Sequence, residues 1–297
     1  MENSRPYFHD FFSCGFVFFV VKKNIFIYMS KQKLTYRIES PFAEGGMAVL
    51  YSIVTSDGQS AILRELRGRY VCRLSIRARF IRGIKIRASL TPHPSLVNSL
   101  ELGSNWFKPY EIIEKVPGCN LRVLINKRGE AIRIHREEIL IAAARGLAYM
   151  HQNQILHLDV KPENFLVDTA DRVNPVVKLT DFDLACPVEQ ARSFRRVGTP
   201  AYMAPEQFRC KISLKASDVF AFGVMAYQLC SGRFPFSGNS EQQTMRNQSD
   251  ETTKPRPLSD FVRDISPRLE RVIMRSLAKR TQDRYPDMNA FLNDLTS

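Results

Sequence analysis

The sequence predicts an α+β fold in which strands come first and helices follow. Between residues 34 and 66, apolar and polar residues alternate as half-buried strands require. Between residues 137 and 151, apolar residues recur at helical spacing, which predicts a buried helix. The 297 residues, 44% of them hydrophobic, are enough for one two-lobed enzyme or for two small domains.

The net charge of +13 permits an acidic partner, whether nucleic acid, anionic lipid or acidic protein, but no motif specific for nucleic acid accompanies it. The six cysteines form no C-x-x-C pair and have no histidine at metal-ligand spacing. They are Cys14, Cys72, Cys119, Cys186, Cys210 and Cys230. Neither a zinc site nor a disulfide framework is therefore expected, and a reducing cytoplasm is the plainest location.

The strongest functional pattern lies between His157 and Asp183. The sequence reads H-L-D-V-K-P-E-N from His157 to Asn164 and D-F-D from Asp181 to Asp183. Transfer of a phosphoryl group from a nucleotide to a hydroxyl needs a carboxylate near the hydroxyl, a cation near the phosphate and oxygen ligands for Mg²⁺. This stretch supplies residue types for all of these roles.

The pattern H-x-D-x-K-P-x-N followed by D-F-x resembles the catalytic and metal-binding loops of the eukaryotic-type (Hanks-type) serine/threonine protein kinases. The sequence G-T-P-A-Y-M-A-P-E at residues 198–206 is similar to the end of their activation segment. The resemblance implies a bilobal fold, with a small antiparallel β lobe and a larger, mainly helical lobe. It also implies ATP and Mg²⁺ as cofactors and a protein serine or threonine as the acceptor.

By the same resemblance, each residue of the catalytic stretch receives a role. Asp159 is expected to act as the base that positions the hydroxyl, and Lys161 to steady the phosphate. Asn164 and Asp181 are expected to hold Mg²⁺. Thr199 is expected to hydrogen-bond Asp159 and Lys161 at the acceptor site.

The expected nucleotide-binding residues come from two further segments. Residues 43–51 resemble the glycine-rich loop, with alanine in place of its first and third glycines. Residues 110–118 resemble the hinge, and Leu96-Val97 and Trp106-Phe107 suggest the two strands that lead to it. Contacts with the nucleotide are expected from Ala43, Gly45, Ala48 and Val49 of the loop and from the backbone of Glu114 and Val116 of the hinge.

The small lobe departs from the family pattern at the phosphate-binding cation. Arg64 stands where the family has lysine and is expected to be a substitute phosphate contact. The usual glutamate partner on the following helix is missing, because Gly83 or Ile84 occupies its position and no acidic residue lies between positions 65 and 101. Asp183 replaces a glycine, and its carboxylate could ligate the metal, repel the phosphates or point outward.

Residues 64–87 carry nine basic side chains and the single acid Glu65. The basic residues are Arg64, Arg67, Arg69, Arg73, Arg77, Arg79, Arg82, Lys85 and Arg87. One interpretation is a solvated helix face whose long stems cover apolar residues. The other is a docking surface for an acidic partner.

Two structural roles are expected in the larger lobe. Glu206 is expected to form a buried ion pair with Arg284, where loss of either partner would be costly. Asp218 is expected to accept backbone N–H groups of the catalytic loop, although it could also serve as a helix N-cap.

The resemblance covers residues 33–296 and leaves residues 1–28 as an N-terminal extension. Two lysines separate the apolar run Phe11–Val21 from the apolar residues 25–29, and neither piece reaches the ~20 residues that span a bilayer. No convincing transmembrane helix or signal peptide is therefore expected. Two interpretations stay open: translation that begins at Met29, or a weak membrane-contacting tail.

The leading function is transfer of the ATP γ-phosphoryl group to protein serine or threonine. The main alternative is a pseudokinase, a nucleotide-binding or scaffolding regulator, which the departures in the small lobe favour. Retention of a base together with two metal ligands argues against it. A small-molecule phosphotransferase fits less well, because residues 198–206 resemble a peptide-site signature.

Leu158 generates a prediction about control. In many kinases an arginine precedes the catalytic aspartate and pairs with a phosphate on the activation segment, which a leucine cannot do. Activity is therefore expected not to require phosphorylation of Ser193, although Arg192, Arg195 and Arg196 lie close to it in sequence. Wild type and Ser193→Ala, both treated with phosphatase, should phosphorylate one acceptor at equal rates. A large loss of activity in either sample, compared with untreated wild type, would point to another basic residue as the phosphate sensor.

Overall fold

The computed structural model describes residues 34–127, 130–168, 175–193 and 198–297, together with four two-residue strands nearer the N-terminus. These form two antiparallel pairs: β1 (Phe16–Val17) with β4 (Tyr28–Met29), and β2 (Val20–Val21) with β3 (Asn24–Ile25). The remainder of the expected N-terminal extension lies outside the described residues. Within the described ranges, no helix combines the length and apolarity that a membrane crossing requires.

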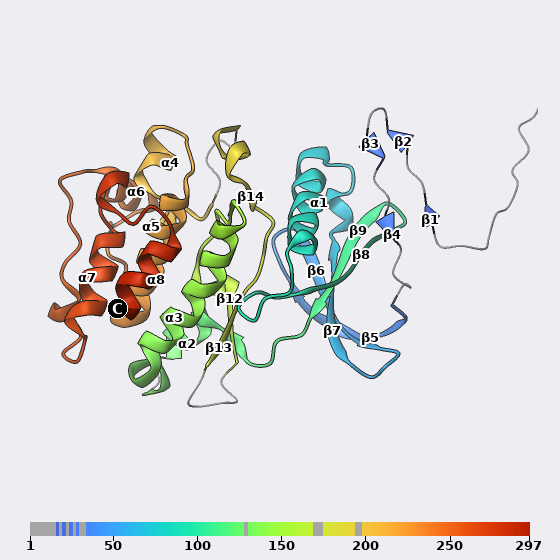
Figure 1. Ribbon diagram of the computed structural model, residues 1–297, viewed down its shortest axis with the longest axis horizontal. Coiled ribbons are helices and arrows are strands. Elements are labelled where there is room, and N and C mark those ends of the chain that lie inside the picture. The colour runs from blue at the N-terminus through green and yellow to red at the C-terminus, as the bar shows by residue number, and fades with distance from the viewer. Residues whose placement is uncertain are drawn as a thin grey trace, which may run out of the picture.

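A five-stranded antiparallel sheet and one long helix form the smaller lobe (Figure 1). In the spatial order of the sheet, the strands are β5 (Tyr36–Glu44), β6 (Ala48–Thr55), β7 (Ser60–Leu66), β9 (Lys108–Glu114) and β8 (Ser99–Asn105), and helix α1 (Leu74–Ser89) follows β7. The strands expected between residues 34 and 66 are confirmed. The strand expected at Trp106-Phe107 is wrong: these residues form the turn between β8 and β9, with φ angles of 45° and 67° that no strand adopts. Leu96-Val97 likewise precedes β8 and is not part of it.

The two faces of the sheet carry different partners. Alternate residues of a strand point to opposite faces. Leu63 packs with Tyr110 on one face, and Leu66 packs with Phe80 of α1 on the other. Arg64 lies on the α1 side, because its guanidinium stacks on the Phe80 ring with 4.9 Å between centroid and Cζ. The sheet therefore turns Arg64 toward the helix and the interior.

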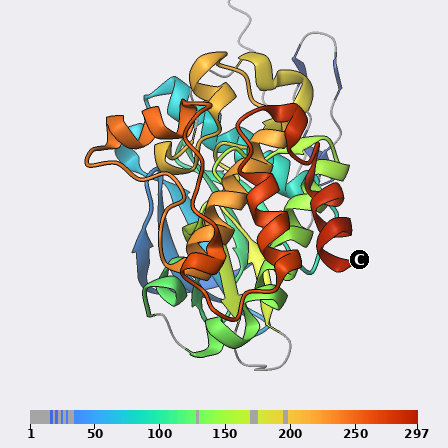
Figure 2. The same ribbon diagram turned by 90° about the vertical axis from the view of Figure 1, so that its left-hand side faces the viewer.

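The larger lobe is mainly helical and lies at the opposite end of the molecule from the five-stranded sheet (Figures 1 and 2). Its helices are α2 (Leu121–Lys127), α3 (Glu130–Gln152), α4 (Pro205–Arg209), α5 (Lys215–Ser231), α6 (Glu241–Ser249), α7 (Pro267–Ser276) and α8 (Met288–Thr296). Helix α3 contains the predicted helix at residues 137–151 but begins earlier, with a kink at His135. The expected bilobal α+β architecture is confirmed.

Short strands place the catalytic stretch at the junction of the lobes. They are β10 (Cys119–Asn120), β11 (Ile155–Leu156), β12 (Phe165–Asp168), β13 (Val176–Leu179) and β14 (Cys186–Pro187). β12 and β13 form an antiparallel ladder in which Phe165 pairs with Leu179. The Thr180 N–H donates to the Asn164 carbonyl at 2.8 Å. This ladder therefore brings Asn164 beside the segment that carries Asp181.

The predicted ion pair between Glu206 and Arg284 is present and buried. Both terminal nitrogens of Arg284 donate to the Glu206 carboxylate, at 2.9 and 2.7 Å. Ser217 also donates to this carboxylate, at 2.6 Å. The pair joins α4, α5 and the segment before α8, because Arg284 further donates to the Ala216 carbonyl at 2.9 Å.

Replacing Arg284 by methionine should therefore destabilise the fold. The substitution leaves a buried carboxylate without its cation, which costs about 3–5 kcal/mol in the free energy of unfolding. The control is Arg271→Met: Arg271 pairs with Asp294 at 2.9 Å, but its side chain is 60% exposed, so its loss should cost less than ~1 kcal/mol. Urea unfolding of both variants measures the difference, and equal losses would contradict a structural role for the buried pair.

Candidate active site

One buried carboxylate, that of Asp218, anchors the catalytic loop. Asp218, near the start of α5, accepts the backbone N–H groups of His157 and Leu158, each at 2.9 Å. His151 lies 3.1 Å from the same carboxylate. Leu158 has a φ of 63°, a conformation that non-glycine residues rarely adopt. The two hydrogen bonds that Asp218 accepts fix this turn, and the contact of Asp218 with the catalytic loop is the one that the sequence predicted.

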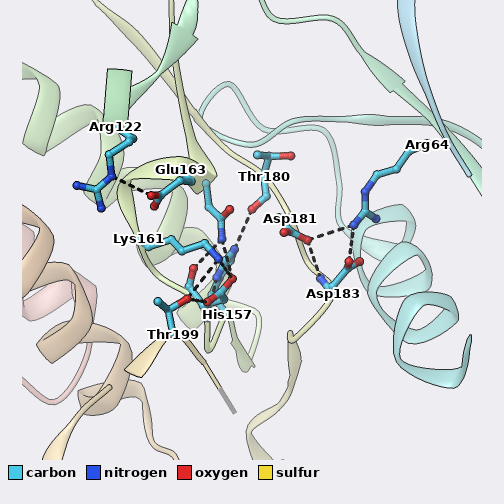
Figure 3. Close-up of polar contacts among 11 residues, drawn as sticks. Arg64, Arg122, His157, Lys161, Glu163, Thr180, Asp181, Asp183 and Thr199 are labelled. Atoms are coloured by element: carbon cyan, nitrogen blue, oxygen red, sulfur yellow. Dashed lines mark hydrogen bonds and ion pairs between the residues drawn. The ribbon is translucent and has the colours of Figure 1, made fainter. Parts of the chain in front are cut away.

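Asp159 is the focus of a network of donors, two of which, Lys161 and Thr199, are labelled in Figure 3. Its carboxylate accepts a hydrogen bond from Lys161 Nζ at 2.6 Å and another from Thr199 Oγ1 at 2.9 Å. Asn164 Nδ2 donates to the Asp159 carbonyl at 2.7 Å and approaches its carboxylate at 3.2 Å. Lys161 Nζ also lies 3.3 Å from Thr199 Oγ1, so both expected contacts of Thr199 are present. The network fixes the direction of the Asp159 carboxylate.

Asp181 lies at the edge of the cleft with a partly exposed carboxylate. Its φ is 59°, a strained value typical of functional sites. Arg64 approaches the carboxylate at 3.2 Å, and 37% of the Asp181 side chain is exposed. Burial opposes ionisation, but the cations Arg64 and Arg87, with His157, outweigh it and hold the pKa of Asp181 below its ordinary value. Asp181 is therefore an ionised carboxylate with an accessible edge.

Arg64 has a glutamate partner, although the sequence indicated none. The residue is Glu111 of β9, whose carboxylate accepts from Arg64 Nη1 at 2.9 Å. Arg64 and Glu111 stand directly opposite each other in the β7–β9 register. A glutamate therefore does orient Arg64, although it comes from the neighbouring strand and the helix that follows β7 carries none.

Asp183 points inward, and the outward alternative is wrong. Its side chain is 5% exposed and accepts from Arg64 Nη2 at 2.5 Å. Burial, supported by the negative charges of Asp181 and Glu111, raises the pKa of Asp183 to about 7 despite the adjacent Arg64. Figure 3 shows Arg64 reaching toward both aspartates.

A cleft of about 570 Å³ joins these groups to the expected nucleotide-binding segments. Among the residues that line it are Gly45, Ala48, Arg64, Glu114, Val116, Asp159, Lys161, Asn164, Asp181 and Asp183. Ala43 and Val49 are not among the lining residues, whereas Leu50 is. Side chains alternate along β6, so Ala48 and Leu50 face the cleft and Val49 faces away. This alternation is the signal that would have pointed to Leu50.

The basic stretch of residues 64–87 divides into several environments. Arg64 and Arg87 are buried in the interior. Arg82 donates to the Ala185 carbonyl at 3.1 Å, and Arg69 stacks on Tyr70. The exposed members are Arg69, Arg73, Arg79 and Lys85. A solvated helix face therefore describes only part of the stretch.

The cleft has the size and the donor set for a nucleotide with Mg²⁺. Its apolar walls include Ile62, Ile113 and Leu166, and its volume lies within the range of small-ligand sites. Mg²⁺ binds through few protein oxygens and keeps water or phosphate as its other ligands, which the amide of Asn164 and the carboxylate of Asp181 suit. Within the described ranges, no cluster of three or more histidine, cysteine or acidic side chains forms a separate metal site.

The fold and the cleft supply the residue types that phosphoryl transfer requires, and comparison with known proteins identifies the family. The model of the protein kinase domain matches residues 36–294, so the chain belongs to this family. It is 29% identical over 274 residues to the probable serine/threonine-protein kinase PknB of Corynebacterium glutamicum, covering 88% of this chain and 41% of the relative. It is 30% identical over 256 residues to the serine/threonine-protein kinase PrkC of Bacillus subtilis, covering 84% of this chain and 38% of the relative.

The chain therefore spans about two fifths of the length of these curated relatives. Because the relatives are named as serine/threonine-protein kinases, the comparisons give the pseudokinase alternative no support. The recognition of the family from the catalytic loop and the activation-segment signature is confirmed.

The pair formed by Asn164 and Asp181 predicts a Mg²⁺-dependent nucleotide site. The thermal shift that ATP produces should grow when Mg²⁺ is added and should lose this dependence in Asp181→Ala, because the variant lacks the ionised ligand. The control is Asp260→Ala, which removes an exposed carboxylate paired with Arg256. If the shift is the same with Mg²⁺, with chelator and in Asp181→Ala, the metal site is not functional.

Proposed function

We propose that the protein transfers the γ-phosphoryl group of ATP to serine or threonine hydroxyls of protein substrates. The observation that carries the proposal is the Asp159 carboxylate, held by Lys161 and Thr199 at the edge of the cleft that also contains Asn164 and Asp181. Such a carboxylate can accept the hydroxyl proton while the phosphoryl group moves.

The roles of the other residues follow from their positions. Lys161 donates to Asp159 and can offset negative charge on the phosphoryl group. Asn164 and Asp181 would hold Mg²⁺, which neutralises the phosphate charge when bound. The apolar walls would receive the adenine, beside the backbone of Glu114 and Val116. Arg64 would contact the phosphates from the small lobe, since it lines the same cleft.

Residues 198–206, which resemble the end of the activation segment, support a protein hydroxyl as the acceptor. Thr199 connects the activation-segment signature to Asp159 through its 2.9 Å hydrogen bond. Tyr202 in the same signature is buried and donates to Gln228 at 2.8 Å. The signature is therefore anchored at both the catalytic loop and α5, which supports a peptide platform rather than a small-molecule site.

An acidic protein that docks on Arg69, Arg73, Arg79 and Lys85 remains a prediction, as does a cytoplasmic location. These four side chains are exposed on or before α1, so their charge is available to a partner. The boundaries 33–296 of the kinase domain also remain a prediction.

The purified chain should incorporate labelled phosphate from ATP and Mg²⁺ into a generic basic protein, on serine or threonine. Asp159→Asn should reduce the rate by about 10²- to 10⁴-fold, because the amide cannot accept the hydroxyl proton. The control is Glu241→Gln on the exposed first turn of α6, which should transfer phosphate at the wild-type rate. Transfer that is equally fast in Asp159→Asn and wild type would refute the assignment of the base.

A further inference from the structure

Five charged side chains form one cluster at the back of the cleft. The anions are Glu111 from β9 and Asp181 and Asp183 from the segment after β13; the cations are Arg64 from β7 and Arg87 from α1. Glu111 is fully buried and Arg87 is 3% exposed. Buried charges persist only where opposite charges compensate them. The cluster must therefore be understood as one unit.

The sheet, rather than helix α1, supplies one of the three anions that pair with Arg64. Arg64 and Glu111 are cross-strand neighbours, so the β7–β9 register alone places their side chains together. At Gly83, one of the two positions where the family's glutamate would fall, helix α1 has no room for a side chain. A Cβ atom on Gly83 would lie 2.6 Å from the Phe182 carbonyl oxygen, which would force the helix away from the Asp-Phe-Asp segment.

The geometry also explains why arginine stands at position 64. A guanidinium has five N–H donors and an ammonium has three. Glu111, Asp181 and Asp183 each accept one hydrogen bond from Arg64, at 2.9, 3.2 and 2.5 Å. An arginine held in this way keeps two donors for phosphate, whereas a lysine held by three carboxylates keeps none.

We propose that Glu111 and Asp183 are positioning residues that hold Arg64 toward the nucleotide phosphates. They replace the glutamate that the family carries on the helix after this strand. The inference rests on the proposed function, because it assigns a role within the same site. Its consequence is that Arg64 stays oriented by strand β9 and by the Asp-Phe-Asp segment, independently of any acid on α1.

Arg87 completes the charge balance of the cluster. Its Nη1 atom lies 3.6 Å from Glu111, and its guanidinium stacks on the Phe182 ring with 4.7 Å between Cζ and centroid. With Arg87 present, two cations face three carboxylates. The arriving Mg²⁺ would face the remaining negative charge, on the side where Asp181 is exposed. Arg87 thus places a second cation beside Glu111 while Arg64 is shared with the two aspartates.

The first test removes the charge of Glu111 and keeps its shape. Glu111→Gln should raise the KM for ATP and weaken binding of a non-hydrolysable ATP analogue by about tenfold, the usual effect of losing one charge-assisted hydrogen bond. Glu111→Asp should recover part of this loss. The matched control is Glu65→Gln on the neighbouring position of β7, where Glu65 pairs with Lys108 at 3.3 Å away from the cluster; it should leave both values unchanged.

The second test uses the donor count. Arg64→Lys should weaken analogue binding in the wild-type background, because all three ammonium donors are taken by carboxylates. In the Asp183→Gly background, the lysine regains a free donor, so Arg64→Lys should weaken analogue binding clearly less. Calorimetric titration of the analogue into the four proteins of this cycle measures the coupling.

The outcomes separate this inference from the proposed function. Analogue binding needs no turnover, so a chain without phosphotransfer still tests the positioning role. Unchanged KM and analogue affinity in Glu111→Gln, with only a lower Tm, would reduce Glu111 to a structural residue and overturn the proposal. If Arg64→Lys weakens analogue binding equally in both backgrounds, Asp183 has no positioning role. If Glu111→Gln does not fold, Glu111→Asp and the Asp183 cycle decide the matter.

Discussion

The buried guanidinium of Arg64 imposes a constraint on both lobes. It sits on a strand of the small lobe, yet two of its three carboxylate partners, Asp181 and Asp183, belong to the segment that leaves the larger lobe. A buried cation without anions is unfavourable, so the contacts between Arg64 and the two aspartates hold the lobes in a fixed relative position. The same contact orients Asp181, the proposed metal ligand. Lobe arrangement and site geometry thus depend on one set of hydrogen bonds.

A second buried pair shows the contrast between structural and site electrostatics. Glu206 and Arg284 form a closed network in which two nitrogens of Arg284 meet one carboxylate and carbonyls take the other donors. In the Arg64 cluster, by comparison, one oxygen each of Glu111 and Asp183 has no hydrogen-bond partner among the described residues. All three side-chain nitrogens of Arg87 likewise lack a hydrogen-bond partner among the described residues, so the cluster is only partly satisfied, whereas the Glu206–Arg284 network is saturated.

Local motifs were predictable from the sequence, and long-range pairings were predictable only where a motif carried them. The catalytic loop, Thr199, Asp218 and the Glu206–Arg284 pair follow from short, ordered patterns and are present in the structure. Glu111 was missed because its role depends on strand register, which local sequence does not set. Aromatic residues favour strands, so the sequence predicts a strand at Trp106-Phe107, although here both residues adopt positive φ. The choice of Leu50 over Val49 likewise depends on which face of β6 meets the cleft.

The most direct test is a crystal structure of the chain with Mg²⁺ and a non-hydrolysable ATP analogue. The account predicts that Arg64 donates to a phosphate oxygen while it still contacts Glu111, and that the metal lies between Asn164 and Asp181. It also predicts that the γ-phosphate faces Asp159. A nucleotide whose phosphates avoid Arg64, or a metal bound away from Asp181, would contradict the proposed site.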